Sequence, residues 1–184
     1  MNNDILRHPR LQTATRIHII GGPGSGKTTL AQQLANHLKV TPYDLDKVGY
    51  AGGNGPQRSL TARQTDIERI LAQSGWVTEG VFLWWTDPLL QAAETIIWLD
   101  PPWQVALWRI VTRHLKLSWA GTNKHKGWRK LLGFMRWAFH YYTTDEIVSP
   151  QSLDDGAILT DGATNRAVTA QHLQPYQAKL IHRN

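Results

Sequence analysis

A glycine-rich stretch near the N-terminus, residues 21–29, constrains the fold of this chain more than any other part of the sequence. It reads Gly-Gly-Pro-Gly-Ser-Gly-Lys-Thr-Thr. Residues 16–20 before it form a short apolar run with three β-branched isoleucines, and residues 30–38 after it carry apolar side chains at helical spacing. The spacing Gly-x4-Gly-Lys-Thr between a strand and a helix is the phosphate-loop pattern. We therefore expect a strand, a P-loop and a helix at the centre of the fold.

The residue types of this loop indicate phosphate binding. Glycines let the backbone curl so that its N–H groups point inward, and the helix N-terminus adds partial positive charge. Lys27 can reach the β- and γ-phosphates, and the Thr28 hydroxyl can ligate Mg²⁺. The alternative is a turn that binds nothing, but the flanking elements, the lysine and the hydroxyl together favour binding. We expect a nucleoside triphosphate to be held by Gly22, Pro23, Gly24, Ser25, Gly26, Lys27, Thr28 and Thr29.

Length and composition restrict the class of protein. With 184 residues, the chain suits one α/β domain spanning 1–184. It has no cysteine, which excludes disulfides, thiolate metal sites and thiol nucleophiles. The first residues lack the apolar stretch of a signal peptide, and no run approaches the length needed to cross a bilayer. We expect a soluble, cytoplasmic protein with no membrane partner.

Positive charge is concentrated in one segment. The formal net charge is +6, yet residues 101–144 hold eight Lys/Arg and no Asp or Glu. Five of the nine tryptophans fall in the same window. A basic, aromatic-rich segment suits the phosphates of a nucleotide, a nucleic acid or an acidic surface.

Strand and helix patterns alternate along the chain. We expect strands at 16–20, 40–46, 76–79, 95–99 and 157–160, and a glycine-rich loop at 47–59. Helical spacing predicts helices at 26–38 and 61–71, a short one from about 88, then helices from 101 to 118, 128–142 and 165–180. This alternation predicts an α/β fold of three layers, a P-loop NTPase with a five-stranded parallel sheet covered on both faces.

The order of these signals resembles the adenylate-kinase-like group of small P-loop kinases. The resemblance is closest to the branch of DNA topology modulation proteins, or adenylate-kinase-related kinases. The matching pieces are the P-loop, Leu45-Asp46, residues 76–80, residues 95–102, the Arg109-x3-Arg113 pair and residues 157–162. Two features depart from the group, Val81-Phe82 in place of Asn-Tyr and the glycine-rich loop at 49–56. The resemblance implies a nucleoside-monophosphate-kinase-like fold with a basic helical lid or insert at about 101–144.

The resemblance also implies roles for two acids at strand ends. Asp46 would lie near the phosphoryl acceptor, through Mg²⁺ or by contact with the hydroxyl, with Asp44 as its nearby alternate; a loop or capping residue is the other interpretation. Glu79 would hold Mg²⁺ through water or orient the acceptor, unless it is an ordinary strand-end carboxylate. The expected metal residues are thus Thr28, Asp46 and Glu79, placed where strand carboxyl ends face a ligand crevice.

Basic and aromatic residues complete the expected site. Arg109 and Arg113 resemble the arginine pair at the lid of these enzymes, and the absence of acids around them favours catalysis over a solvated helix face. The expected catalytic residues are Lys27, Asp46, Arg109 and Arg113. Arg58 and Arg63 could bind an anionic acceptor, although solvated helix charges are the favoured interpretation. The stripe of Phe134, Trp137 and Tyr141 is expected to pack on the core or on a partner subunit.

The leading functional interpretation is a kinase that uses ATP and Mg²⁺ to phosphorylate a small molecule, such as a nucleotide, nucleoside or sugar-like compound. A nucleic-acid-associated ATPase or regulator, with residues 109–136 on the phosphate backbone, is the alternative. A signalling GTPase is disfavoured, because residues 122–126 lack the acid of an Asn-Lys-x-Asp guanine reader. The acceptor, the preference for ATP or GTP and the oligomeric state are left open by the sequence.

Overall fold

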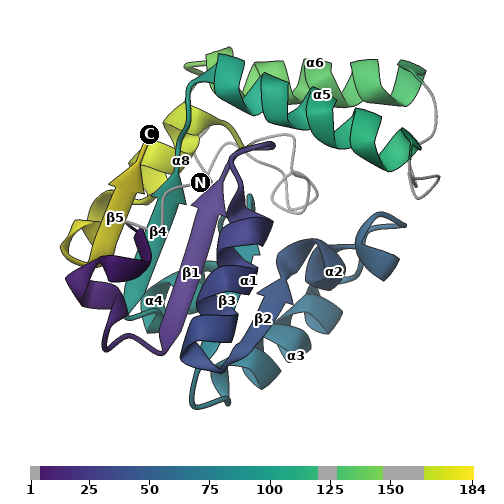
Figure 1. Ribbon diagram of the computed structural model, residues 1–184. Coiled ribbons are helices and arrows are strands. Elements are labelled where there is room, and N and C mark those ends of the chain that lie inside the picture. Colours follow the sequence, from purple (N-terminus) through teal and green to yellow (C-terminus); the bar gives the residue numbers. More distant parts are fainter. Residues whose placement is uncertain (1–4, 120–127, 147–163) are drawn as a thin grey trace.

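The computed structural model describes residues 5–119, 128–146 and 164–184. A parallel sheet with the strand order β2-β3-β1-β4-β5 runs through its centre (Figure 1). Its strands are β1 (Arg16–Gly21), β2 (Thr41–Asp44), β3 (Trp76–Gly80), β4 (Thr95–Leu99) and β5 (Leu180–Arg183). The expected α/β fold with a five-stranded parallel sheet is confirmed.

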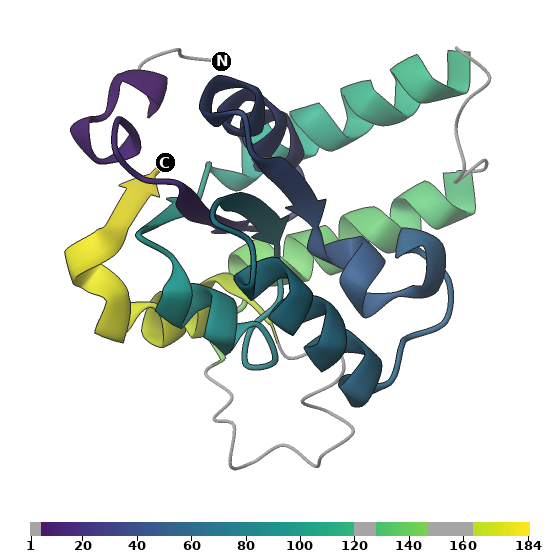
Figure 2. The same cartoon turned by 90° about the horizontal axis from the view of Figure 1, so that it is seen from below.

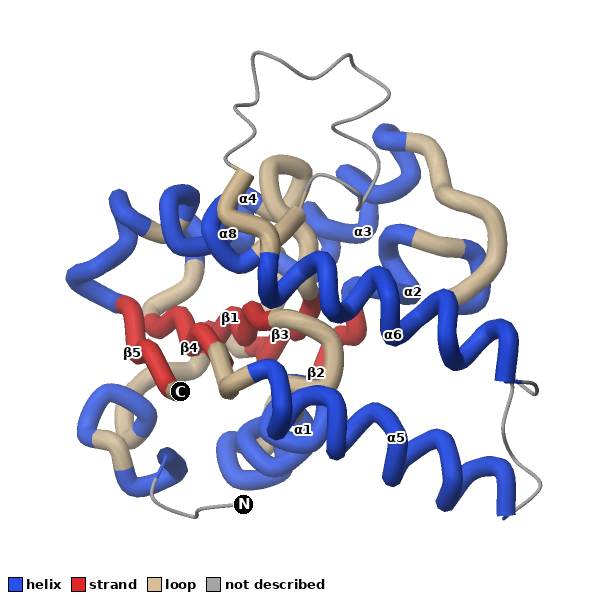
Figure 3. The backbone as a smooth tube through the Cα atoms, turned by 90° about the horizontal axis from the view of Figure 1, so that it is seen from above, coloured by secondary structure: helices blue, strands red, loops and turns tan. Residues whose placement is uncertain are grey.

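Helices cover both faces of this sheet. They are α1 (Lys27–Leu38), α2 (Leu45–Gly49), α3 (Leu60–Leu71), α4 (Asp87–Ala92), α5 (Trp103–Trp119), α6 (Trp128–Thr143) and α8 (Arg166–His172). Short 3-10 turns are η1 (Ile5–Arg7), η2 (Pro9–Leu11), η3 (Ala51–Gly53) and η6 (Gln174–Lys179). In the view along the sheet, α1 lies on one side and α3, α4 and α8 lie on the other (Figure 3). This is the expected three-layer arrangement.

The sheet divides the apolar interior in two, because successive side chains of a strand point to opposite faces. Ile17 and Ile19 of β1 pack with Leu34 of α1. Ile20 faces the larger cluster that contains Trp76 and residues of α2, α3, α4, α6 and α8. Every β1 residue from position 17 to 21 is buried, so the P-loop begins at the end of a strand that is held by the core.

The two basic helices lie side by side across the carboxyl ends of the strands (Figures 1 and 3). A small apolar cluster of Ile110, Leu131 and Ala138 joins α5 to α6. Of the cationic side chains of α5, Arg109 reaches the P-loop at Ser25. The predicted helices at 101–118 and 128–142 are therefore present, with nearly the expected bounds.

The N-terminal turns and the C-terminal strand meet at one edge of the molecule (Figure 2). Arg10 Nη1 donates a 3.4 Å hydrogen bond to the Leu180 carbonyl oxygen. Ile5 and Leu11 share an apolar cluster with Ile181. Among the described helices, none is both long enough and apolar enough to traverse a bilayer.

The structure corrects the sequence analysis at two places. Strand β2 ends at Asp44, and α2 starts at once, so Asp46 lies in the first turn of a helix within what was expected to be strand and loop. The predicted helix at 165–180 ends at His172, and the chain continues through η6 into the unexpected strand β5. The predicted strand at 157–160 lies outside the described residues.

Candidate active site

A cavity of about 840 Å³ opens at the carboxyl ends of the strands. It lies between the P-loop, the α2–η3 segment and the helices α5 and α6. This is the edge at which parallel α/β sheets bind ligands. Its lining comprises Pro23, Gly24, Gly26, Lys27, Thr28, Thr29, Asp46, Tyr50, Gly53, Asn54, Gly55, Glu79, Gly80, Val81, Phe82, Arg109, Ile110, Thr112, Arg113, Lys116, Phe134 and Trp137.

The P-loop adopts a conformation that requires glycine. Gly24 has a φ of +73° and Gly26 has a φ of +101°, both in the left-handed region that L side chains rarely adopt. Gly26 is the N-cap of α1, so the helix begins at Lys27 with its N–H groups turned toward the loop. An atom at the Cβ position of Gly24 would lie 2.5 Å from the Ala106 carbonyl oxygen of α5. The loop is therefore curled and packed closely beneath α5.

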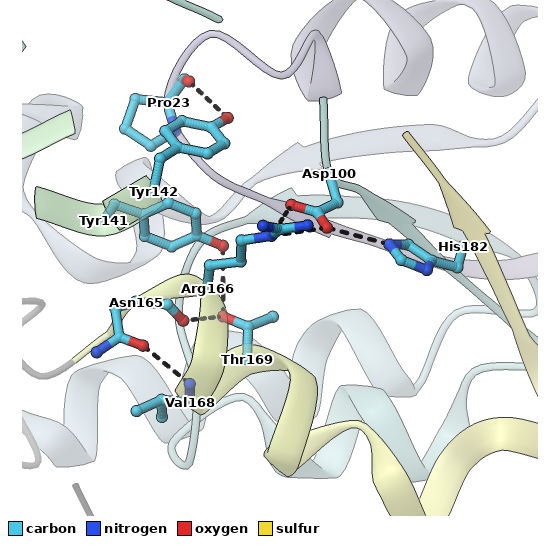
Figure 4. Close-up of polar contacts among 9 residues, drawn as sticks. All are labelled: Pro23, Asp100, Tyr141, Tyr142, Asn165, Arg166, Val168, Thr169 and His182. Carbon is cyan, nitrogen blue, oxygen red and sulfur yellow. Dashed lines mark hydrogen bonds and ion pairs between the residues drawn. The ribbon is translucent and has the colours of Figure 1, made fainter. Parts of the chain in front are cut away.

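Both basic helices also hold the loop through hydrogen bonds to its carbonyl groups. Arg109 of α5 donates from Nη1 to the Ser25 oxygen at 2.9 Å. Tyr142 of α6 donates from its hydroxyl to the Pro23 oxygen at 3.0 Å (Figure 4). These bonds occupy carbonyl oxygens and not the N–H groups that would face an anion. Within the loop, the Ser25 N–H already donates to the Gly22 oxygen at 3.3 Å.

Lys27 lines the cavity near the acids Glu79 and Asp46. Its Nζ donates to the Gly22 carbonyl oxygen at 3.0 Å. Part of the side chain reaches the cavity. The surrounding protein lowers the pKa of Lys27, mainly through loss of hydration. The carboxylates of Glu79 and Asp46 act in the opposite direction and raise it. A bound polyphosphate would add negative charge beside the ammonium group and favour its protonated form.

Thr28 and Glu79 form a pair of oxygen groups at the end of β3. The Thr28 hydroxyl donates to Glu79 Oε1 at 2.7 Å. Burial raises the pKa of Glu79, while Lys27 and the bond from Thr28 lower it. Hydroxyl and carboxylate oxygens are the ligands that Mg²⁺ accepts, usually alongside waters and phosphates. Thr28, Glu79 and Asp46 all line the cavity, so the oxygen set present there fits Mg²⁺.

Asp46 projects from α2 into the open side of the cavity. Its backbone N–H binds Asp44 Oδ1 at 3.0 Å, which makes Asp44 the N-cap of α2. Although Asp46 is exposed, loss of hydration and the nearby Asp44 raise its pKa to about 6, against the opposing effect of Lys27. A carboxyl group whose pKa lies this close to neutrality in a cleft is typical of functional sites.

The cations of α5 form a row along one wall. Arg109, Arg113 and Lys116 lie on one side of the helix because their spacing is four and three residues, and all three line the cavity. Lys116 is missing from the sequence-based site, although its position one turn beyond Arg113 on the same helix face was a usable signal.

The other residues singled out in the sequence fall into two groups. Phe134 and Trp137 line the cavity, whereas Tyr141 is buried in the core against the P-loop, so the aromatic stripe divides between site and core. Arg58 and Arg63 lie outside the cavity lining, and neither is a freely solvated charge. Arg58 binds Asp66 at 2.6 Å, and Arg63 is 1% exposed. The favoured interpretation of these two arginines was therefore wrong.

Comparison with known proteins gave matches among solved structures alone: no protein-family model and no curated protein matches the chain. A shikimate kinase from Bacteroides thetaiotaomicron is 18% identical, with a TM-score of 0.44 over 90% of this chain and 98% of that one. A shikimate kinase from Acinetobacter baumannii in complex with shikimate is 14% identical, with a TM-score of 0.42 over 91% and 94%. A gluconokinase from Sinorhizobium meliloti 1021 is 16% identical, with a TM-score of 0.42 over 68% and 94%. The strand order and the curled P-loop define the class of this chain on their own: a P-loop α/β fold.

Proposed function

We propose that this protein is an ATP-dependent kinase that transfers the γ-phosphoryl group of ATP to a hydroxyl group of a small molecule. The observation that carries the proposal is the convergence of three elements on one cavity. The P-loop with Lys27, the cationic row that begins at Arg109, and the acids Asp46 and Glu79 all face the same space. Phosphoryl transfer needs such positioning and charge stabilisation more than it needs covalent chemistry from the protein.

Each group has a role that follows from its place. The P-loop N–H groups and Lys27 would hold the β- and γ-phosphates, and Arg109 and Arg113 would offset the charge that spreads over the transferring oxygens. Thr28 and Glu79 would hold Mg²⁺, which when bound neutralises phosphate charge and orients the phosphates, and Asp46 would contact the acceptor hydroxyl. Arg109 already touches the loop through Ser25, so its guanidinium group is positioned before any ligand arrives.

In the transfer, one P–O bond forms, one P–O bond breaks and one proton moves. The acceptor oxygen forms a bond to the γ-phosphorus, the bond from that phosphorus to the bridging oxygen breaks, and ADP leaves with the electron pair. The acceptor proton passes to the Asp46 carboxylate, whose pKa of about 6 keeps it mostly ionised at neutral pH. Asp46 then returns the proton to solvent.

The experiment is a screen of ATP consumption. The purified protein with Mg²⁺ and ATP is given pools of nucleoside monophosphates, nucleosides, sugars and aminoglycoside-like compounds, and ADP release is measured. We expect release that depends on one pool and is lost in Lys27→Ala and Asp46→Asn. Trp119→Ala serves as the control, since this side chain is 96% exposed and lies outside the cavity lining.

The nucleic-acid interpretation predicts a different result. If ADP release in every pool equals release without acceptor, the kinase proposal fails. A salt titration of DNA or RNA binding, with and without ATP, would then test whether the basic window binds phosphate backbone. The kinase is favoured because Arg109, Arg113 and Lys116 of that window line the cavity.

A further inference from the structure

The last turn of α6 packs against the start of the P-loop. An atom at the Cβ position of Gly22 would lie 2.4 Å from Tyr141 Cε1 and 2.8 Å from Tyr142 Cζ, so glycine is the residue that lets the loop approach both rings. The two rings meet edge to face at a centroid distance of 5.1 Å. Gly22 and Pro23 are themselves buried. The first residues of the loop therefore rest against two tyrosines.

The hydroxyl groups of these tyrosines have different partners (Figure 4). Tyr142 donates to the Pro23 carbonyl oxygen at 3.0 Å. The hydroxyl oxygen of Tyr141 lies 3.3 Å from that of Thr169 on α8. The Thr169 hydroxyl donates to the Asn165 oxygen at 2.7 Å, so Tyr141 is the donor in its own bond to Thr169. One tyrosine hydroxyl thus binds the P-loop, and its neighbour binds the core.

The bond from Tyr142 fixes the direction of the peptide group between Pro23 and Gly24. In a trans peptide, the C=O and the following N–H lie in one plane and point in opposite directions. The described residues contain no cis peptide bond. Because the Pro23 oxygen is held toward α6, the Gly24 N–H is directed away from that helix. Gly24 lines the cavity, and its N–H makes no hydrogen bond to any described residue.

Gly22 connects the same part of the loop to Lys27. The Gly22 carbonyl oxygen accepts a hydrogen bond from Lys27 Nζ at 3.0 Å and another from the Ser25 N–H at 3.3 Å. A displacement of the Gly22–Pro23 segment would therefore move the acceptor that holds the ammonium group together with the Gly24 N–H.

We infer that Tyr142 is a positioning residue for polyphosphate binding: its hydroxyl holds the Pro23–Gly24 peptide so that the Gly24 N–H is presented to a phosphate oxygen. The inference rests on the proposed function and deepens it. Tyr142 is not among the residues that line the cavity, so it acts through the loop rather than on the ligand. It lies 119 positions from Pro23 along the chain, which makes the conformation of the loop depend on the docking of α6.

Calorimetry with two matched variants tests the inference. Tyr142→Phe and Tyr141→Phe each keep the ring and remove one hydroxyl. Burial raises the pKa of both tyrosines, so each variant loses a neutral donor and no charge. We expect Tyr142→Phe to weaken MgATP binding by about fivefold, because a hydrogen bond that orients the loop is lost. Tyr141→Phe should stay within about twofold of the natural protein.

Stability separates positioning from a general loosening of α6. Each variant gives up one buried hydrogen bond of the same kind, so urea denaturation should show comparable losses of stability for the two. A purely structural role for Tyr142 would then give the two variants the same affinity for MgATP. Positioning predicts that the affinity falls in Tyr142→Phe alone.

A second measurement observes the peptide itself. Pro23-Gly24 is the single Pro-Gly pair in the sequence, so labelling with ¹³C-carbonyl proline and ¹⁵N-glycine leaves one amide signal in a carbonyl-selected NMR spectrum. Saturating MgATP should shift this signal in the natural protein and in Tyr141→Phe. The shift should be smaller in Tyr142→Phe at the same degree of saturation.

Three results would overturn the inference. They are unchanged MgATP affinity in Tyr142→Phe, an equal loss of affinity in Tyr141→Phe, and a Gly24 signal that does not respond to bound MgATP. If the natural protein binds MgATP and any of these results is found, the kinase proposal stands and only the role of Tyr142 is wrong. If the folded natural protein takes up no MgATP, the proposed function fails and this inference fails with it.

Discussion

The protein around Asp46 disfavours ionisation of its carboxyl group. The contribution of Asp46 to the stability of the folded state therefore depends on pH. The pKa of Asp46 is raised to about 6 from an ordinary value of 3.8, mainly by loss of hydration and by Asp44. A raised pKa in the folded state means that this group favours folding below pH 4, and that this contribution is lost as the pH rises through about 6.

Asp46→Asn should therefore raise the melting temperature at pH 7.5 and leave it nearly unchanged at pH 3.5. The asparagine keeps the shape of the side chain and removes the ionisation, so the difference between the two proteins should appear between pH 4 and 6. Thermal unfolding followed by circular dichroism across this range measures it. A lower melting temperature for the variant at pH 7.5 would show that the carboxylate stabilises the folded state. The same variant should lose kinase activity, which would be the usual trade between stability and function.

Gly24 supplies a second prediction at the level of single residues. Gly24→Ala places a side chain at a φ of +73° and a Cβ atom 2.5 Å from the Ala106 oxygen. We expect a loss of about 1–2 kcal/mol from the backbone alone, a further loss from displacement of α5, and weaker binding of MgATP. Denaturant unfolding and calorimetry measure these effects.

Gly52→Ala is the matched control for Gly24. Gly52 has a φ of +67°, but an added Cβ would have no neighbour within 4 Å. The control should therefore show the backbone cost without the steric cost. Equal losses of stability and MgATP affinity in the two variants would mean that close packing of the P-loop against α5 is unimportant.

Among the secondary-structure elements, β4, α8 and β5 are tied together by one buried carboxylate. Asp100, directly after β4, accepts hydrogen bonds from Arg166 Nε of α8 at 2.9 and 3.0 Å and contacts His182 Nε2 of β5 at 3.2 Å (Figure 4). The His182 ring also stacks on Trp98 at a centroid distance of 4.1 Å. The edge strand β5 is thus fixed by side chains as well as by its pairing with β4.

Asp100→Asn should lower the free energy of unfolding by roughly 1–2 kcal/mol, since it removes the charge from these bonds while Arg166 and His182 stay partly hydrated. Urea denaturation gives the value, and hydrogen exchange should show earlier opening of β5 than of β1. Glu68→Gln, an exposed change on α3, is the control and should alter stability by less than about 0.5 kcal/mol. If Asp100→Asn leaves the free energy of unfolding unchanged, this network does not stabilise the fold.

The strands differ in how well the sequence predicts them, for a physical reason. β1, β3 and β4 are continuous buried runs, and each was expected within one residue of its bounds. β5 was not expected, because it is a short edge strand in which Ile181 is the one buried residue and the two residues after it, His182 and Arg183, are polar and exposed. Pro175 was an available signal that the helix after Asn165 must end early, since η6 begins around it.

Across the whole molecule, the candidate site was predictable where it is local in sequence. The P-loop residues and Glu79 fall next to strand ends, so their place follows from the sheet. The positions of Phe134, Trp137 and Tyr142 depend on how α6 packs across the sheet. The local sequence pattern does not predict that packing. The partners of Asp100 are likewise 66 and 82 positions away along the chain. Long-range packing, rather than residue type, determines which side chains complete the cavity.

Binding of MgATP by the folded protein tests the central claim most directly, because every assigned role depends on a polyphosphate held at the P-loop. Isothermal titration calorimetry should show one site for the natural sequence and no measurable site for Lys27→Ala with an intact circular dichroism spectrum. Lys39→Asn, at the other end of α1, removes the same charge at a residue whose φ of 56° asparagine tolerates, and it should bind normally. No uptake of MgATP by the natural protein, or equal uptake by Lys27→Ala, would contradict the claim.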